Sequence, residues 1–133
     1  MNTTIESTVL IQKPISEVYT FLADLNKHEQ LMPENIYNWS STADEARFTI
    51  QNMAKLAIKI SSRVENREIA AIPSEEAPFA LELKWLLQDL GNGTTEAKHL
   101  ISAELNMMMK MLAVGPLQKL ADHQTAQLKA ILS

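Results

Sequence analysis

Residues 79–106 read FALELKWLLQDLGNGTTEAKHLISAELN, and the interpretation of this stretch decides the fold. Its first half fits an amphipathic helix, because its leucines recur at helical spacing and its residues are good helix formers. It also fits a strand, because apolar residues occupy every second position. The turn Gly91-Asn92-Gly93 and the alternating, threonine-rich segment after it favour the strand. We therefore predict an antiparallel hairpin of residues 79–90 and 94–106.

Upstream of the hairpin, the sequence predicts five shorter strands and two helices. Residues 4–12 alternate between apolar and polar positions, which is typical of a half-buried strand. A helical spacing follows over residues 16–25, and a second short helix over residues 26–32 is ended by Pro33. The next strands are predicted for residues 36–41, 46–51, 55–65 and 68–72.

Downstream of the hairpin, residues 107–133 are predicted to be helical. Ala113, Leu117, Leu120, Ala121, Gln124, Leu128 and Ile131 form one stripe at the helical period. Pro116 should kink this helix or mark the start of its long half. Because strands and helices do not alternate, the fold class is α+β, with an antiparallel sheet folded around the C-terminal helix in one domain, residues 1–133.

Residues 9–24, VLIQKPISEVYTFLAD, together with the order of the elements, resemble the SRPBCC superfamily of START-like and polyketide cyclase-like proteins. The resemblance covers essentially the whole chain. It implies a helix-grip fold, in which a curved seven-stranded antiparallel sheet surrounds a long C-terminal helix, with two short helices between strands 1 and 2. It also implies a cavity between the sheet and that helix. Relatives use such cavities to carry lipids, sterols or hormones, to cyclise or dehydrate polyketides, or to dock on a partner protein.

Composition excludes several classes of function. The formal net charge of −4 argues against a nucleic-acid partner and against a polybasic membrane-surface protein. The chain has no cysteine, which excludes thiolate chemistry and disulfides. No apolar run approaches the about 20 residues of a membrane span, and no signal peptide is visible, so we expect a cytoplasmic protein, either a monomer or a homodimer.

Motifs for metal, nucleotide or nucleophilic chemistry are missing from the sequence, so we predict no metal and no cofactor. His99 is the one candidate for catalysis, because strand alternation places it on the apolar face of its strand, where Trp85 also lies. The three glutamates of the hairpin, Glu82, Glu96 and Glu104, have the opposite parity. An inward carboxylate to orient the imidazole is therefore not evident, which favours a core histidine over an acid–base catalyst.

Ligand-binding residues are predicted on the inward faces of the strands and of the last helix. The methionines at 107–109 and 111 either form a soft lining at a pocket mouth or fill the core. In an antiparallel sheet, the connections 51–54, 73–78 and 106–108 must meet at one end, where we expect the pocket to open. The predicted ligand-binding residues are Phe48, Met53, Leu83, Trp85, His99, Ile101, Met108, Met109, Leu112 and Leu117.

The sequence thus favours a protein that binds or carries a small apolar or amphipathic molecule without catalysis. An alternative is a polyketide cyclase or dehydratase that uses His99. A second alternative is an interaction module whose cavity has been filled by side chains.

Overall fold

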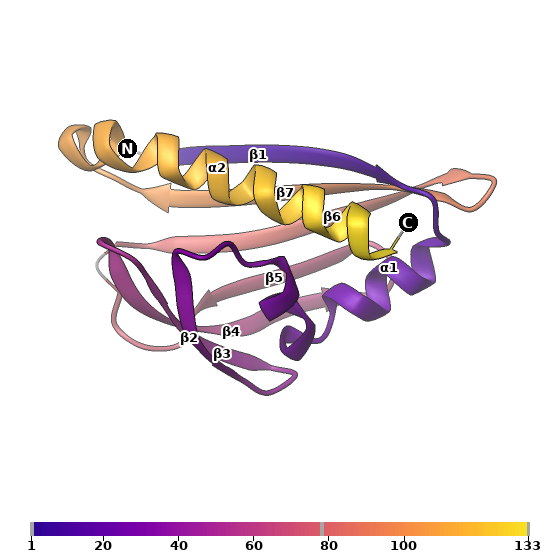
Figure 1. Cartoon of the computed structure of the whole chain (residues 1–133), viewed down its shortest axis with the longest axis horizontal. Coiled ribbons are helices and arrows are strands. Elements are labelled where there is room, and N and C mark those ends of the chain that lie inside the picture. The colour runs from indigo at the N-terminus through magenta and orange to yellow at the C-terminus, as the bar shows by residue number, and fades with distance from the viewer. Residues whose placement is uncertain (1, 78, 133) are drawn as a thin grey trace.

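The computed structural model describes residues 2–77 and 79–132, and it shows one curved sheet with a long helix laid along it (Figure 1). The strand order is β1-β7-β6-β5-β4-β3-β2, and all neighbouring strands are antiparallel. The predicted α+β class and helix-grip arrangement are therefore confirmed. The strands are β1 (Asn2–Ile11), β2 (Ile36–Ser41), β3 (Glu45–Ile50), β4 (Ala54–Val64), β5 (Glu68–Pro73), β6 (Leu81–Gly91) and β7 (Thr94–Glu104).

The hairpin that decides the fold forms as a strand pair. In β6 and β7, Trp85 lies directly opposite His99, and both side chains are buried. The turn places Gly91, Asn92 and Gly93 at positive φ, a conformation that glycine and asparagine tolerate best. Sheet pairing and burial of one face outweigh the helix propensity of the leucines, because a helix would leave the apolar alternation unmatched.

Two short helices connect β1 to β2, as predicted, but the boundary between them lies earlier in the chain than the sequence indicated. Helix α1 (Ile15–Leu22) ends before Leu25, because the carboxylate of Asp24 accepts a hydrogen bond from the backbone N–H of Asn26 at 2.9 Å and caps a new helix. That helix, η1 (Leu25–Leu31), has 3-10 geometry. It carries Leu25, His28 and Leu31 inward.

The C-terminal helix α2 (Met107–Leu132) contacts β1, β7 and η1. Pro116 lies inside it, so the helix does not begin there. Proline removes the hydrogen bond to the carbonyl of Leu112, and this residue is largely exposed, so water can solvate that carbonyl. The buried residues of α2 are Ala113, Leu117, Ala121, Gln124, Thr125 and Leu128. Five of them belong to the predicted stripe, and Thr125 was not predicted. Of the other two stripe residues, Leu120 is partly buried and Ile131 is exposed.

Strand direction gathers three connections at one end of the molecule. The loops after β3, β5 and β7 lie at the end where α2 begins, and the β6–β7 turn lies at the other (Figure 1). This part of the prediction is confirmed. The first turns of α2 extend beyond the sheet, however, so Met107, Met108 and Met111 are 65–80% exposed and neither line a pocket nor fill the core. Met109 alone of the four packs against the core.

Candidate ligand-binding cavity

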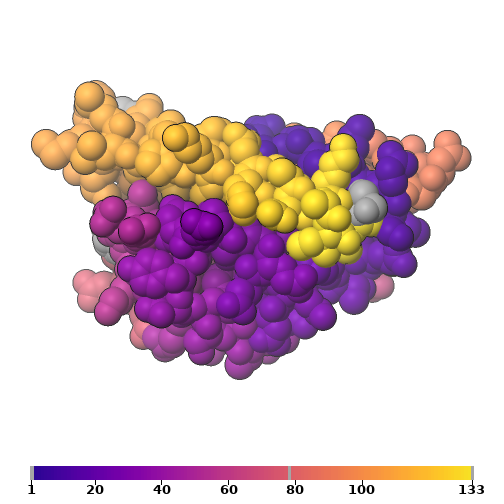
Figure 2. Space-filling view, viewed as in Figure 1, coloured from indigo at the N-terminus to yellow at the C-terminus, as the bar shows by residue number. Residues whose placement is uncertain are grey.

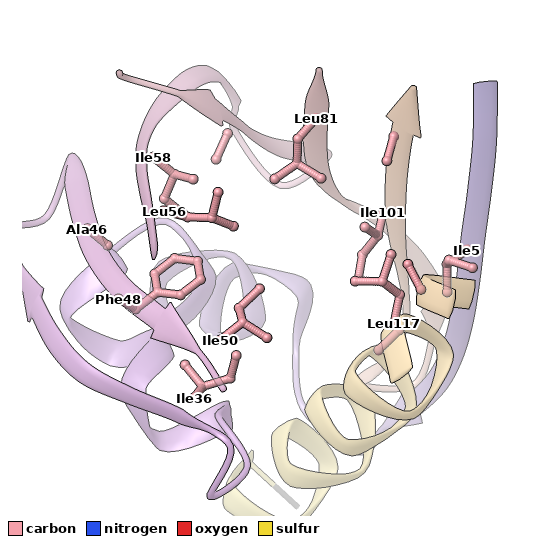
Figure 3. Close-up of a cluster of buried hydrophobic side chains, with 14 of the residues drawn as sticks. Ile5, Ile36, Ala46, Phe48, Ile50, Leu56, Ile58, Leu81, Ile101 and Leu117 are labelled. Carbon is pink, nitrogen blue, oxygen red and sulfur yellow. The ribbon is translucent and has the colours of Figure 1, made fainter. Parts of the chain in front are cut away.

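An internal cavity lies between the concave face of the sheet, η1 and α2. In Figure 3, side chains of β2, β3 and β4 face those of β6, β7 and α2 from opposite walls. Its lining consists of Leu25, His28, Met32, Ile36, Trp39, Phe48, Ile50, Leu56, Ile58, Ile60, Ile69, Ala71, Phe79, Leu81, Leu83, Trp85, His99, Ile101, Leu117, Leu120 and Gln124. The cavity volume is about 50 Å³. Many residues line the cavity, but the space between their side chains is narrow.

The lining is almost entirely apolar. Among the residues that the structure describes, it contains no Asp, Glu, Lys or Arg. Its polar groups are the imidazoles of His28 and His99, the amide of Gln124 and the indole N–H groups of Trp39 and Trp85. A ligand in this space would meet hydrocarbon on most sides and a few fixed hydrogen-bonding groups, which is the usual composition of a small-molecule site.

His99 is fully engaged by its neighbours. Its ring stacks on Trp85 with 4.2 Å between ring centroids. Its Nδ1 lies 3.1 Å from the backbone oxygen of Lys84, and its Nε2 lies 2.8 Å from Oε1 of Gln124. A neutral imidazole has one N–H, which Nδ1 can donate to Lys84, and a half-turn of the Gln124 carboxamide then directs its NH₂ to Nε2.

Burial sets the charge of both cavity histidines. It lowers the pKa of His99 to about 4, and the hydrogen bonds to Lys84 and Gln124 oppose this only in part. Burial also lowers the pKa of His28, whose Nε2 lies 2.8 Å from the backbone oxygen of Leu22. At neutral pH the cavity therefore contains two uncharged imidazoles.

Trp39 enters the cavity because of an irregularity in β2. Strand alternation from the buried Ile36 would turn Trp39 to the outside. The pairing with β3 shifts register between Tyr37 and Ser40, and Asn38 has a φ of 57°. This bulge brings Trp39 to the inner face, where it stacks on Phe48 with 5.2 Å between centroids.

The cavity approaches the surface beside η1 and β2. Met32, Ile36 and Trp39 line both the cavity and a shallow hollow on the outside. On the face shown in Figure 2, α2 lies directly against the segment that contains η1 and β2, and side chains of the two close over the interior. We predicted an opening between the connections 51–54, 73–78 and 106–108. The described residues of these connections do not line the cavity, so the cavity does not open there.

The structure brings six of the ten predicted ligand-binding residues together around the cavity: Phe48, Leu83, Trp85, His99, Ile101 and Leu117. Met53 and Met109 pack against the core outside the lining. Met108 and Leu112 are 73% and 72% exposed, because the helix turns that carry them extend past the sheet.

Sequence reasoning missed four polar or sulfur-containing lining residues, namely His28, Met32, Trp39 and Gln124. Gln124 could have been found, since it lies in the predicted buried stripe of the helix. Trp39 could not, because its orientation depends on a bulge that alternation does not reveal. His28 and Met32 belong to the region of η1, where 3-10 geometry changes which side chains face inward.

Two features bear on other kinds of site. Within residues 2–77 and 79–132, no group of three or more histidine or carboxylate side chains is placed to hold a metal ion. The helices in the same residues include none that is long and apolar enough to cross a membrane.

Comparison with known proteins rests on structure, since no family model matches the sequence and no curated protein matches it. A START superfamily protein from Mycobacterium smegmatis is similar, with a TM-score of 0.70, 17% identity and coverage of 97% of this chain and 96% of that one. A protein from Thermus thermophilus has a TM-score of 0.77, 15% identity and coverage of 98% and 97%. The di-domain ARO/CYC protein BexL, from the BE-7585A biosynthetic pathway, has a TM-score of 0.69, 15% identity and coverage of 96% and 45%.

Proposed function

We propose that this chain, which has the SRPBCC or START-like fold, binds a small apolar or amphipathic molecule in the cavity between its sheet and α2, without catalysing a reaction. The observation that carries this proposal is the uncharged, hydrocarbon-rich lining around a narrow internal space. Because most of this lining is apolar, an apolar guest gains dispersion contacts with the cavity walls.

The narrowness of the cavity sets a condition on binding. Space for a few water molecules does not accommodate a larger guest, so some lining side chains have to move. Met32 and Leu120 are the best placed to do so, because both are partly buried where η1 and α2 approach each other. The flexible thioether chain of methionine adapts to such changes at little cost.

The contacts of His99 argue against a cyclase or dehydratase. Both of its ring nitrogens are occupied, one by a strand carbonyl and the other by Gln124. The described lining also has no carboxylate to orient the ring or stabilise its charged form. A histidine in this setting serves packing and ligand contact better than proton transfer.

Intrinsic fluorescence gives a direct test, because both tryptophans of the chain line the cavity. Titration with an uncharged medium-chain methyl ketone should change the emission and saturate. Ala71 is a wall residue that is 4% exposed. Ala71→Leu enlarges its side chain and should weaken binding at least 10-fold, since the added atoms occupy the space of the guest. Ala80→Leu is the matched control, because Ala80 is exposed and outside the lining. Equal binding by both variants would exclude the cavity as the site.

A further inference from the structure

The bulge in β2 has two features that are unfavourable for the backbone. Asn38 adopts a left-handed backbone conformation, which is unfavourable for a non-glycine residue, although asparagine tolerates it better than most. The register shift also removes regular pairing with β3 between Tyr37 and Ser40. Bulges of this type commonly redirect a side chain at a functional site.

The side chain that the bulge redirects has an unused donor. The Nε1–H of Trp39 is buried from solvent and has no hydrogen-bond partner among the described residues. A buried N–H without an acceptor destabilises the folded protein, because it has lost its hydrogen bond to water and gained none in return. The two imidazoles and the Gln124 amide of the cavity differ, since His99 bonds to Lys84 and Gln124 and His28 to Leu22.

We propose that Trp39 is the hydrogen-bond donor for the ligand, and that the ligand is an uncharged amphipathic molecule whose oxygen acceptor, such as a ketone, ester or amide carbonyl, accepts from Trp39 Nε1–H. This inference rests on the proposed binding function and specifies its ligand class. The acceptor end of the ligand then lies beside β2, where the cavity and the outer hollow share lining residues, and its apolar part extends along the aliphatic lining.

The charges around the cavity exclude ionised ligands of the same shape. A carboxylate buried here would find no lysine or arginine in the described lining, and an amine would find no carboxylate. Burial keeps the two histidines neutral at pH 7, because it lowers the pKa of each. An unpaired charge moved into such surroundings loses far more hydration free energy than it gains from contacts with the cavity.

The experiment compares three ligands of matched length by calorimetry: a medium-chain methyl ketone, the 2-methyl-1-alkene that replaces its oxygen by a methylene group, and the fatty acid carboxylate. The wild-type chain should bind the ketone about 10-fold more tightly than the alkene, which corresponds to the net contribution of one neutral hydrogen bond. The carboxylate should bind more weakly than either ligand.

Trp39→Phe retains an aromatic ring against Phe48 and removes the donor, so it should bind ketone and alkene with equal affinity and leave alkene affinity unchanged. Tyr37→Phe is the matched control, because it removes a polar hydrogen from an exposed neighbouring ring and should retain the preference. As a readout that needs no variant, the indole N–H resonance of Trp39 should move downfield with ketone and not with alkene.

The outcomes separate the two proposals. If the wild-type chain binds none of the three ligands, the proposed function itself fails. If it binds ketone and alkene equally, if Trp39→Phe keeps the preference, or if the carboxylate binds best, the role of Trp39 and the uncharged ligand class are overturned while cavity binding stands.

Discussion

Acidification should destabilise this protein through His99, and the size of the effect follows from its burial. The imidazole has a pKa of about 4 in the folded chain against 6.5 for an unperturbed histidine. Between these two values the unfolded state binds more protons than the folded state, so stability falls as pH falls. The contribution of His99 is fully present above about pH 6.5 and is lost progressively as the pH approaches 4.

From pH 7 to about pH 4.5, the loss from His99 amounts to about 2 kcal/mol, which is a large part of the stability of a small domain. The pKa of His28 is lowered as well, so its contribution has the same sign. Protonation also puts a charge beside Trp85 in a space with no carboxylate in its described lining, and the two backbone and amide acceptors of His99 compensate for this only partly.

The assay is urea unfolding followed by circular dichroism at several pH values, for the wild-type chain and for His99→Phe. The variant keeps a ring to stack on Trp85 and lacks the titrating group, so its stability should depend on pH less steeply by about 2 kcal/mol over this interval. The carboxylates of the surface affect both proteins alike. Parallel pH profiles, or a His99 ring that titrates near 6.5 in NMR spectra of the folded protein, would refute the reasoning.

Two further predictions concern residues outside the cavity. Arg63→Met should lower the free energy of unfolding by about 1–3 kcal/mol, because the guanidinium donates to the backbone oxygens of Ala23, just after α1, and Ala43, between β2 and β3, and so holds both segments against β4. Lys59→Met, at an exposed position of the same strand, should change the free energy of unfolding by less than about 0.5 kcal/mol in urea unfolding, and equal effects of the two variants would contradict this role. Met108→Lys should leave both stability and ligand affinity unchanged, since its side chain is 73% exposed; a loss of affinity in the fluorescence titration would return this residue to the binding site.

The fold could be predicted from the sequence where the hydrophobic periodicity and the turn residues agreed. Alternation on both sides of the Gly91-Asn92-Gly93 turn predicted the hairpin and placed Trp85 and His99 on the same face, where their rings stack. The helical stripe that contains Leu117 and Gln124 likewise predicted which side of α2 faces the interior. Strand alternation and the helical stripe are both reliable here, because burying a whole face of an element constrains many residues at once.

The site was harder to predict because it depends on departures from regular geometry. The bulge at Asn38 reverses the expected orientation of Trp39, and 3-10 geometry in η1 brings His28 inward. Side-chain chemistry alone favours a pocket position for Met53, Met108 and Met109, yet Met108 is carried into solvent by helix turns that extend past the sheet. Where an element ends relative to its neighbour is a property of the packed structure that periodicity does not contain.

The central claim, that the cavity accepts an uncharged amphipathic guest, is tested most directly by methyl NMR of isoleucine residues during titration with a medium-chain methyl ketone. The methyl resonances of Ile50, Ile58 and Ile101, which line the cavity, should shift together and saturate with one binding constant, while that of the exposed Ile131 stays unchanged. Unchanged cavity resonances at saturating ketone, or shifts confined to surface residues, would contradict the account.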